Sequence, residues 1–317
     1  MFNRLSQSDY RTRFRRKRVF STAALVIFAV FLVFLAFILF IRLSDSGKTD
    51  REALQALWES EAFEKTYAES RERLKQTPLD FFLLTLRGFS AYQLAVAQIN
   101  TFDTINYLND CIWSLRKALL LGEGQTDGRL FYVLGKAYYD KGPEYADLAV
   151  NYLEKARKLD FEARDIPQYL GLAYAAIRDY RSSVMAFTMA LNPYENEAGE
   201  FWSDSLLLAI ANSYLALGET DLAQGYLYRC VETSRDSKSI TAARLLLGGI
   251  MSAKGDSDGA ETQYRMILSE SGENADAHFY LGELYAAAGD STRARAEWRT
   301  AVRVDPAHRP ARIRLNG

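Results

Sequence analysis

Apolar residues recur every three to four positions along most of residues 51–317, and short polar stretches interrupt them at regular intervals. Near the C-terminal end, Leu281 and Tyr285 share one face of a helical projection, and Ala294 and Trp298 share another after a polar turn. This period is typical of amphipathic helices. The pattern therefore predicts an all-α body in which helices follow one another in pairs.

Small residues lie at regular places within these predicted helices. Gly282 falls in the middle of one helix, where glycine costs about 1 kcal/mol relative to alanine. Burial of its neighbours Leu281 and Tyr285, at about 25 cal/mol per Å², offsets this cost if a partner helix packs closely against the glycine. Gly289 is expected to end the helix in a left-handed conformation, which glycine tolerates. We therefore expect Gly282 to mark a close helix–helix contact.

The same pattern recurs upstream at an interval of about 34 residues. The pattern is a leucine or isoleucine, followed directly by glycine or alanine, with tyrosine three positions after that. It occurs at positions 134–138, 170–174, 210–214, 247–251 and 281–285, where position 251 is methionine instead of tyrosine. This pattern resembles the tetratricopeptide repeat (TPR) family, whose unit is a helix–turn–helix of about 34 residues. The resemblance implies a TPR α-solenoid of about six to seven repeats, beginning near residues 47, 81, 128, 164, 204, 241 and 275.

Several positions depart from this pattern. Arg87 replaces the usual leucine in the second unit, and Ser183 replaces the usual alanine in the fourth. An insertion around residues 98–104 is expected to separate the helices of the second unit. Pro143 and Glu144 are read as an insertion in a turn, and residues 194–203 as a longer loop between two units.

Residues 19–41 are 23 consecutive residues without a charge. A helix of this length is roughly 34 Å long, which is enough to cross a hydrocarbon core of about 30 Å. The competing interpretation is a cleaved signal peptide, whose apolar region is shorter, about 7–15 residues, and ends at a small-x-small site. We expect an uncleaved transmembrane anchor, because the run is longer and no convincing cleavage site or lipoprotein cysteine follows it.

Charge is distributed unevenly along the chain. Residues 1–18 hold seven Lys/Arg and one acidic residue, or +6, and the rest holds 32 basic and 39 acidic residues, or −7. Positive residues beside a membrane helix stay cytoplasmic, although a lipid- or nucleic-acid-binding patch is the alternative interpretation of this tail. We therefore predict four parts: a cytoplasmic tail (1–18), a transmembrane helix (19–41), a linker (42–50) and an extracytoplasmic solenoid (51–317). The acidic body argues against nucleic-acid binding.

The sequence offers few residues for catalysis. Its only cysteines, Cys111 and Cys230, fit no metal or redox spacing, and we expect buried thiols rather than a disulfide. Of the two histidines, His278 falls at a packing position, and His308 is expected to be solvated beyond the last repeat. No phosphate-binding loop, zinc spacing or nucleophile elbow is present. We therefore predict no enzymatic activity, no metal and no cofactor.

The resemblance implies where a partner binds. In TPR proteins the first helices line a concave groove that receives a peptide or a helix. The groove-facing positions that we predict are Arg129, Tyr132, Lys136, Tyr139, Gln168, Leu208, Asn212, Leu245 and Phe279. Ordinary packing or solvation is the alternative for each of them. As a set they indicate an apolar stripe with a basic, aromatic entrance, which suits an amphipathic helix. The carboxylate clamp of chaperone-binding TPR domains is absent, since Leu208, Leu246 and Tyr280 stand at its positions.

Two functions are consistent with these features. The first is a membrane-anchored scaffold for protein partners in a bacterial cell envelope, serving secretion, envelope assembly or a flagellar motor. The second is a periplasmic chaperone-like binder of unfolded clients. A third, remote reading is an accessory subunit that regulates an enzyme. Because the linker is short, a partner that is itself associated with the inner membrane is favoured.

Overall fold

The computed structural model describes residues 50–195 and 203–316, and the regular structure in these ranges is helical. Residues 50–59 form a helix that pairs with the next one along the chain. The first helices of the later pairs are α3 (Phe81–Ala97), α5 (Gly128–Lys141), α7 (Ile166–Ala176), α9 (Asp204–Ala216), α11 (Ser237–Ala253) and α13 (Ala275–Ala287). The second helices are α2 (Phe63–Arg73), α4 (Thr101–Leu120), α6 (Ala146–Lys158), α8 (Tyr180–Glu195), α10 (Thr220–Thr233), α12 (Ser257–Ser271) and α14 (Ser291–Val304).

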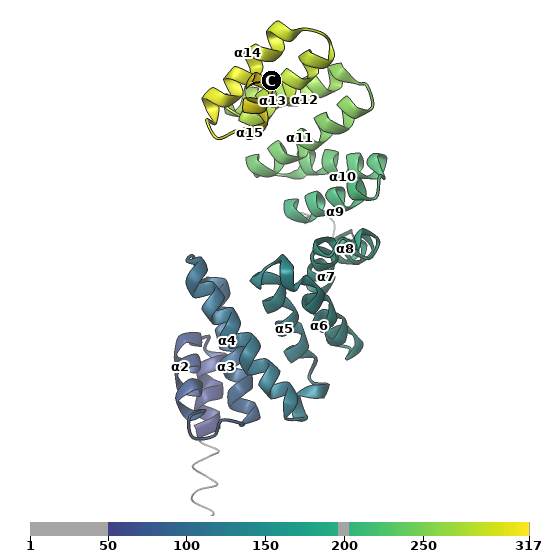
Figure 1. Ribbon diagram of the computed structural model, residues 1–317. Coiled ribbons are helices and arrows are strands. Elements are labelled where there is room, and N and C mark those ends of the chain that lie inside the picture. The colour runs from purple at the N-terminus through teal and green to yellow at the C-terminus, as the bar shows by residue number, and fades with distance from the viewer. Residues whose placement is uncertain (1–49, 196–202, 317) are drawn as a thin grey trace, which may run out of the picture.

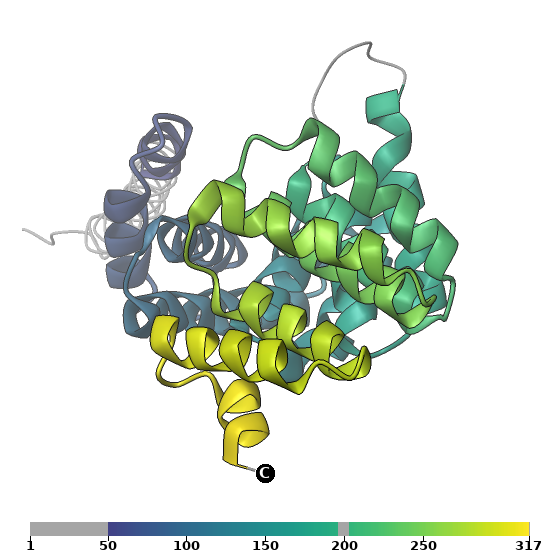
Figure 2. The ribbon, with the colours of Figure 1, turned by 90° about the horizontal axis from the view of Figure 1, so that it is seen from above.

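The pairs stack into a curved solenoid (Figure 1). The two helices of a pair pack against each other, and the second helix of each pair also packs against the first helix of the next pair. The short helix α15 (Arg309–Asn316) packs on α14 at the C-terminal end. Figure 2 looks along the stack and shows that successive units are rotated relative to one another. The all-α repeat architecture predicted from the sequence is confirmed for the described residues.

Glycines at one repeat position explain why the helices of a pair approach so closely. A Cβ atom built on Gly282 lies 2.4 Å from Nε1 of Trp298, and one built on Gly248 lies 2.4 Å from Cε1 of Tyr264. Gly88, Gly135 and Gly171 have the same relation, at 2.4–2.5 Å, to a side chain on the second helix of their pair. The missing Cβ therefore makes room for a large side chain, as the sequence indicated.

Turn residues also behave as the sequence predicts. Gly289 has φ 81°, and Asp290 after it caps α14 by accepting a hydrogen bond from the backbone N–H of Arg293. A side-chain oxygen at the first helical boundary satisfies a backbone donor that has no partner within the helix. In the fourth unit Arg178 occupies the corresponding left-handed position, with φ 63°. Pro143 begins the short 3₁₀ helix η2 (Pro143–Tyr145), which accommodates the predicted insertion.

Ser183, which departs from the repeat pattern, is fully buried but has hydrogen-bond partners. Its hydroxyl donates to the carbonyl of Gly171 at 2.8 Å and lies 3.0 Å from the hydroxyl of Ser213. A buried hydroxyl without a partner costs about 1–3 kcal/mol, so these contacts make serine acceptable at this position. The bond to Gly171 lies within the fourth unit, and the contact with Ser213 links the fourth unit to the fifth.

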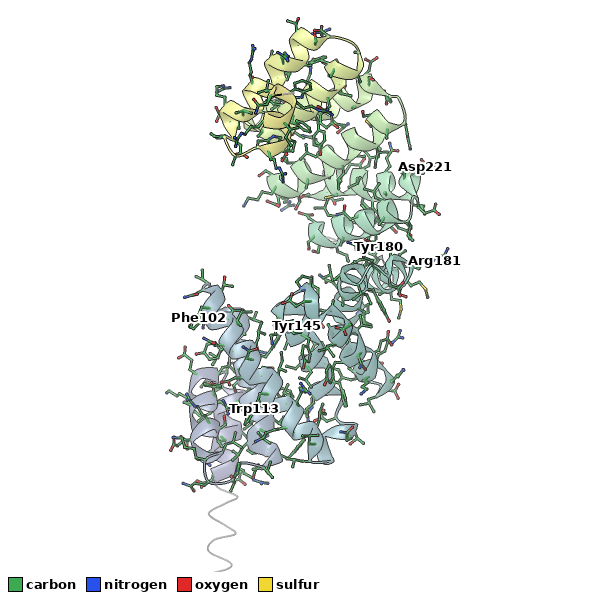
Figure 3. All side chains as sticks on the ribbon, in the orientation of Figure 1. Phe102, Trp113, Tyr145, Tyr180, Arg181 and Asp221 are labelled. Carbon is green, nitrogen blue, oxygen red and sulfur yellow. The ribbon has the colours of Figure 1, made fainter. Side chains whose placement is uncertain are left out.

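The expectation of a separating insertion at residues 98–104 is wrong. Only residues 98–100 lie between α3 and α4, and α4 already begins at Thr101, where the Asn100 side chain accepts from the N–H of Phe102. The extra residues therefore lengthen the helices of the second unit. Phe102, labelled in Figure 3, lies in the first turn of α4 with 72% of its surface exposed.

The predicted membrane anchor lies outside the described residues, as do the basic tail and most of the linker. Within residues 50–195 and 203–316, no helix combines the length and apolar character that a membrane crossing requires. Residues 196–202, within the long loop expected between the fourth and fifth units, also lie outside the description.

Both cysteines are buried free thiols, as the sequence predicts. Cys111 lies on α4 and Cys230 on α10, and neither side chain is exposed. Burial raises the pKa of Cys230 to about 11 and raises that of Cys111 further above the usual range for a thiol.

We expect neither thiol to react rapidly with Ellman's reagent at pH 8 in the native protein, because the reactive thiolate is both scarce and inaccessible. The measurement is the release of the coloured thiolate before and after unfolding in guanidinium chloride. A fast-reacting thiol in the native protein would contradict this assignment for at least one of the two cysteines.

Candidate partner-binding groove

The first helices of the pairs form a continuous row. Contacts join α3 to α5, α5 to α7, α7 to α9, α9 to α11 and α11 to α13, in addition to the contacts within each pair. All nine residues predicted to face a groove lie on α5, α7, α9, α11 or α13. The row therefore places residues far apart in the sequence along one continuous surface.

The two predicted cations at the entrance carry no free positive charge. The exposed side chain of Arg129 forms an ion pair with Asp127, the residue that caps its own helix, at 2.7 Å. Lys136 forms an ion pair with Asp165 across to the next unit, at 2.7 Å, and its side chain is only 15% exposed. A carboxylate from this chain therefore already neutralises each cation.

Lys136 lies at the centre of a group of aromatic side chains, which we call the tyrosine–lysine cluster. Its ammonium group lies 4.7 Å from the ring centre of Tyr169, 5.0 Å from that of Tyr132 and 5.6 Å from that of Tyr92. Tyr139 packs edge-on against Tyr169, with ring centres 5.4 Å apart. The cluster comes from α3, α5 and α7 and includes Asp165, the residue immediately before α7. It consists of Tyr92, Tyr132, Lys136, Tyr139, Asp140, Asp165 and Tyr169.

Hydrogen bonds tie the cluster together. The hydroxyl of Tyr132 donates to Asp165 at 2.7 Å, and that of Tyr92 donates to Asp140 at 2.8 Å. Burial, reinforced by these carboxylates, raises the pKa of both tyrosines, so their hydroxyls stay protonated and keep donating at neutral pH. Tyr132, Lys136 and Tyr139, all on α5, therefore connect their unit to the units on either side. Tyr92, Asp140 and Tyr169 belong to the cluster too and were missed, because the repeat pattern does not mark them.

The remaining predicted residues lie further along the row. Leu208 and Asn212 lie on α9, where Leu208 is half-buried and Asn212 is exposed. Leu245 on α11 and Phe279 on α13 are half-buried and pack against the C-terminal core, and Gln168 on α7 is half-buried as well. The structure is consistent with an apolar stripe at these positions, but contact with a partner at each residue stays a prediction.

The expectation that His308 is solvated is wrong. It is 8% exposed, its ring centre lies 5.3 Å from that of Phe279, and its Nδ1 accepts from the N–H of Ala311. His308 therefore caps α15 and holds that helix against α13. His278 packs as expected, with its Nδ1 2.6 Å from a carboxylate oxygen of Glu297 on α14.

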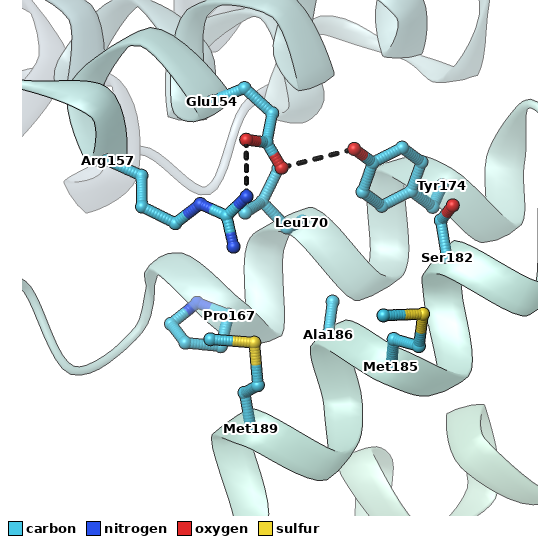
Figure 4. A pocket seen from close by; sticks show the side chains of 9 residues that line it. All are labelled: Glu154, Arg157, Pro167, Leu170, Tyr174, Ser182, Met185, Ala186 and Met189. Atoms are coloured by element: carbon cyan, nitrogen blue, oxygen red, sulfur yellow. Dashed lines mark hydrogen bonds and ion pairs between the residues drawn. The ribbon is translucent and has the colours of Figure 1, made fainter.

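A cleft lined mainly by residues of second helices was not found from the sequence. It lies between α6, α7 and α8, measures about 480 Å³ including space open to solvent, and is shown in Figure 4. Its walls include two exposed methionines, Met185 and Met189, and Glu154 accepts hydrogen bonds from Arg157 and Tyr174. Within the described ranges, no group of three or more acidic, histidine or cysteine side chains could hold a metal ion.

Comparisons with known proteins agree with this architecture. The family model of the tetratricopeptide repeat matches residues 276–308. No curated protein matches the sequence. The C-terminal part of a TPR repeat-containing protein from Cytophaga hutchinsonii has a similar structure, with a TM-score of 0.59 and 14% identity over 84% of this chain and 99% of that chain. This similarity shows the fold alone.

Two further solved structures have lower TM-scores. YrrB, described as a TPR protein with an unusual peptide-binding site, has a TM-score of 0.49 and 23% identity over 64% of this chain and 98% of that chain. MamA from Desulfovibrio magneticus, from residue 41 of that protein to its end, has a TM-score of 0.48 and 16% identity over 57% of this chain and 96% of that chain. Scores below 0.5 add no argument about function.

Proposed function

Because this chain is a tetratricopeptide repeat protein, we propose that it is a non-enzymatic scaffold, anchored in the inner membrane of a bacterial envelope, whose row of first helices binds a protein partner. TPR proteins are in general protein-binding scaffolds rather than enzymes. For this chain we propose three further features: the membrane anchor, the location in the envelope and the groove as the binding site.

The observation that carries the proposal is the continuous row of first helices and the apolar side chains along it. Leu208, Leu245 and Phe279 are each only half-buried within the chain, although all three are large and apolar. Further burial against a partner would contribute about 25 cal/mol per Å² of apolar surface. An amphipathic helix matches such a surface, because its apolar residues repeat along one face.

The sequence of residues 19–41 supports the anchor. An uncharged run of this length after seven basic residues favours a single-pass helix with its N-terminus in the cytoplasm. Only eight residues, 42–49, separate the run from the first described helix. A partner would therefore be bound close to the bilayer, which favours one that is itself associated with the membrane.

Site-specific photo-cross-linking in intact cells tests the groove. We expect a photoreactive residue at Asn212, which is exposed on α9, to give adducts of one or a few discrete masses. The matched control is the same residue at Met266, which is exposed on the second helix α12 and does not belong to the row. Mass spectrometry of the adducts identifies the partner.

The pattern of adducts separates the possible outcomes. Equal adducts from positions 212 and 266 would contradict the groove as the binding site. A broad distribution of many unrelated clients at position 212 would instead support the chaperone-like alternative.

A further inference from the structure

A cleft in the first two units differs in the charge of its lining from the cleft between α6, α7 and α8, which contains both Glu154 and Arg157. It lies between the end of α2, the start of α3 and the middle of α4, and measures about 490 Å³ including space open to solvent. Three basic residues line it, Arg71, Lys75 and Arg87, and no acidic residue does. Its other walls are apolar and are formed by Leu74, Pro78, Leu84 and Trp113.

The basic groups of this cleft have unused hydrogen-bonding capacity. Within the described residues, Arg71 has no ion-pair partner. Lys75 is paired only with Glu72, and both side chains are about two-thirds exposed, so water screens this pair strongly. Arg87 forms an ion pair with Asp110 at 3.0 Å, but its buried Nε–H has no acceptor. The cleft is therefore a concentration of positive charge with donors still to be satisfied.

Arg87 stands where ordinary packing requires a leucine. At the same repeat position the other units have Leu134, Leu170, Ile210, Leu247 and Leu281, all at most 2% exposed. Arg87 is 13% exposed, and its guanidinium group lies between the rings of Tyr67 and Trp113, 5.7 and 5.4 Å from their centres. Burying a cation is costly unless it has partners. Asp110 and the two rings supply some of these partners, but the buried Nε–H has none, which leaves a donor for a ligand.

The cleft lies at the end of the molecule where the chain approaches the predicted anchor. Arg73, in the last turn of α2, donates to the backbone carbonyl of Asp50 at 3.1 Å. The eight residues 42–49 span at most about 28 Å when fully extended. Trp113, a wall of the cleft that is labelled in Figure 3, is 49% exposed, and Leu79, which follows the lining residue Pro78, is 62% exposed. Tryptophan and basic side chains together are typical of surfaces that face lipid headgroups.

We propose that this cleft binds the phosphate headgroup of an anionic lipid in the membrane that residues 19–41 enter. Arginine and lysine donate charge-assisted hydrogen bonds to phosphate oxygens, and arginine can do so with two parallel bonds. The indole of Trp113 then lies against the glycerol and the first acyl carbons. The proposal rests on the membrane anchor of the proposed function, but it does not depend on the groove.

The test uses the full chain in a neutral detergent, titrated with short-chain phosphatidylglycerol or with phosphatidylcholine of the same chain length. The readout is the emission of Trp113, obtained as the difference between the chain and its Trp113→Phe variant. We expect a saturable change with phosphatidylglycerol at concentrations where phosphatidylcholine has little effect. Since each basic side chain near an anionic surface contributes a factor of roughly five, Arg71→Gln with Lys75→Gln should weaken binding by about tenfold or more.

The matched control is Arg295→Gln with Arg299→Gln on α14. Both arginines are exposed, and this variant removes the same charge at the opposite end of the solenoid (Figure 1). It should bind phosphatidylglycerol as the unchanged chain does. The cleft variant should keep the melting temperature of the unchanged chain, because Arg71 and Lys75 are exposed.

Three results would overturn the proposal. An equal loss in both double variants would show general electrostatic attraction, to which the basic tail also contributes. An equal response to the two lipids would remove the requirement for an anionic headgroup. A response to glycerol phosphate as strong at equal concentration as the response to phosphatidylglycerol would show that the cleft binds free phosphate esters and that the lipid adds nothing. Partner cross-linking at Asn212 is independent of all three, so the two proposals fail separately.

Discussion

Gly248→Val is expected to lower the free energy of unfolding by about 1–3 kcal/mol. A Cβ atom at this position lies 2.4 Å from the ring of Tyr264, whose side chain is 1% exposed and has no room to move aside. Either the ring or the backbone of α11 must shift, which separates two helices that pack together in the sixth unit. Urea unfolding followed by circular dichroism at 222 nm measures the change.

The chain provides a matched control for this change in the next residue. Gly249 lies on the same helix, is exposed, and has no heavy atom within 4 Å of a built Cβ. Gly249→Val should leave the stability unchanged or raise it slightly, because valine has a better helix propensity than glycine. Similar losses at positions 248 and 249 would show that backbone conformation, and not close packing, explains the repeat glycines.

Lys136→Met should destabilise the protein by about 1–3 kcal/mol, since it removes charged hydrogen bonds from a largely buried site. Methionine has a similar length and fills the same space, so the loss is mainly electrostatic. Asp165 keeps its bond from Tyr132 but loses the ammonium group at 2.7 Å, and three tyrosine rings lose their cation. Urea unfolding monitored by tyrosine and tryptophan fluorescence measures the effect.

Lys254→Met is the control for the change at Lys136. Lys254 also donates to a carboxylate of the preceding unit, Asp221, at 2.6 Å, but Asp221 is 90% exposed. An exposed ion pair is screened by water and contributes little, so the free energy of unfolding in urea should not change. If the Lys136 variant likewise kept the free energy of unfolding of the unchanged chain, the tyrosine–lysine cluster would not hold the units together.

The sequence was most informative where the repeat constrains the side chain. The pairs of helices, the turn at Gly289 and the close contact at Gly282 could all be predicted, because each recurs in several units and has a local physical reason. The unusual serine at position 183 could be recognised as a departure, but its partner Ser213 lies 30 residues away. Only the fold shows that the two hydroxyls meet.

The repeat was a poorer guide at the ends and in the irregular unit. His308 follows the last full repeat, so its sequence neighbours gave no sign that α15 would fold back and bury it against Phe279. In the second unit, residues beyond the standard length suggested a loop, yet Asn100 caps α4 early and they continue the helix. The cap at Asn100 and the helix-forming sequence after it explain why these residues are helical.

In the proposed groove, too, the sequence predicted the positions of residues but not their contacts between units. The sequence placed Tyr132, Lys136, Leu245 and Phe279 on first helices, because the repeat register assigns each residue to a face. It could not show that Lys136 is neutralised by Asp165, since the two residues belong to different units and meet only when those units stack.

The sequence by itself determined the class of the fold, the register of its helices and the positions where small residues admit a neighbouring helix. These properties depend on residues close together along the chain and are repeated from unit to unit. Only the tertiary structure decided which charges are paired, how the C-terminal helix is held, and that Arg71, Lys75 and Arg87 share one cleft with Trp113. Those properties depend on contacts between different helices. The free energy of these contacts depends on burial and on distances between residues of different units, which a local sequence pattern does not specify.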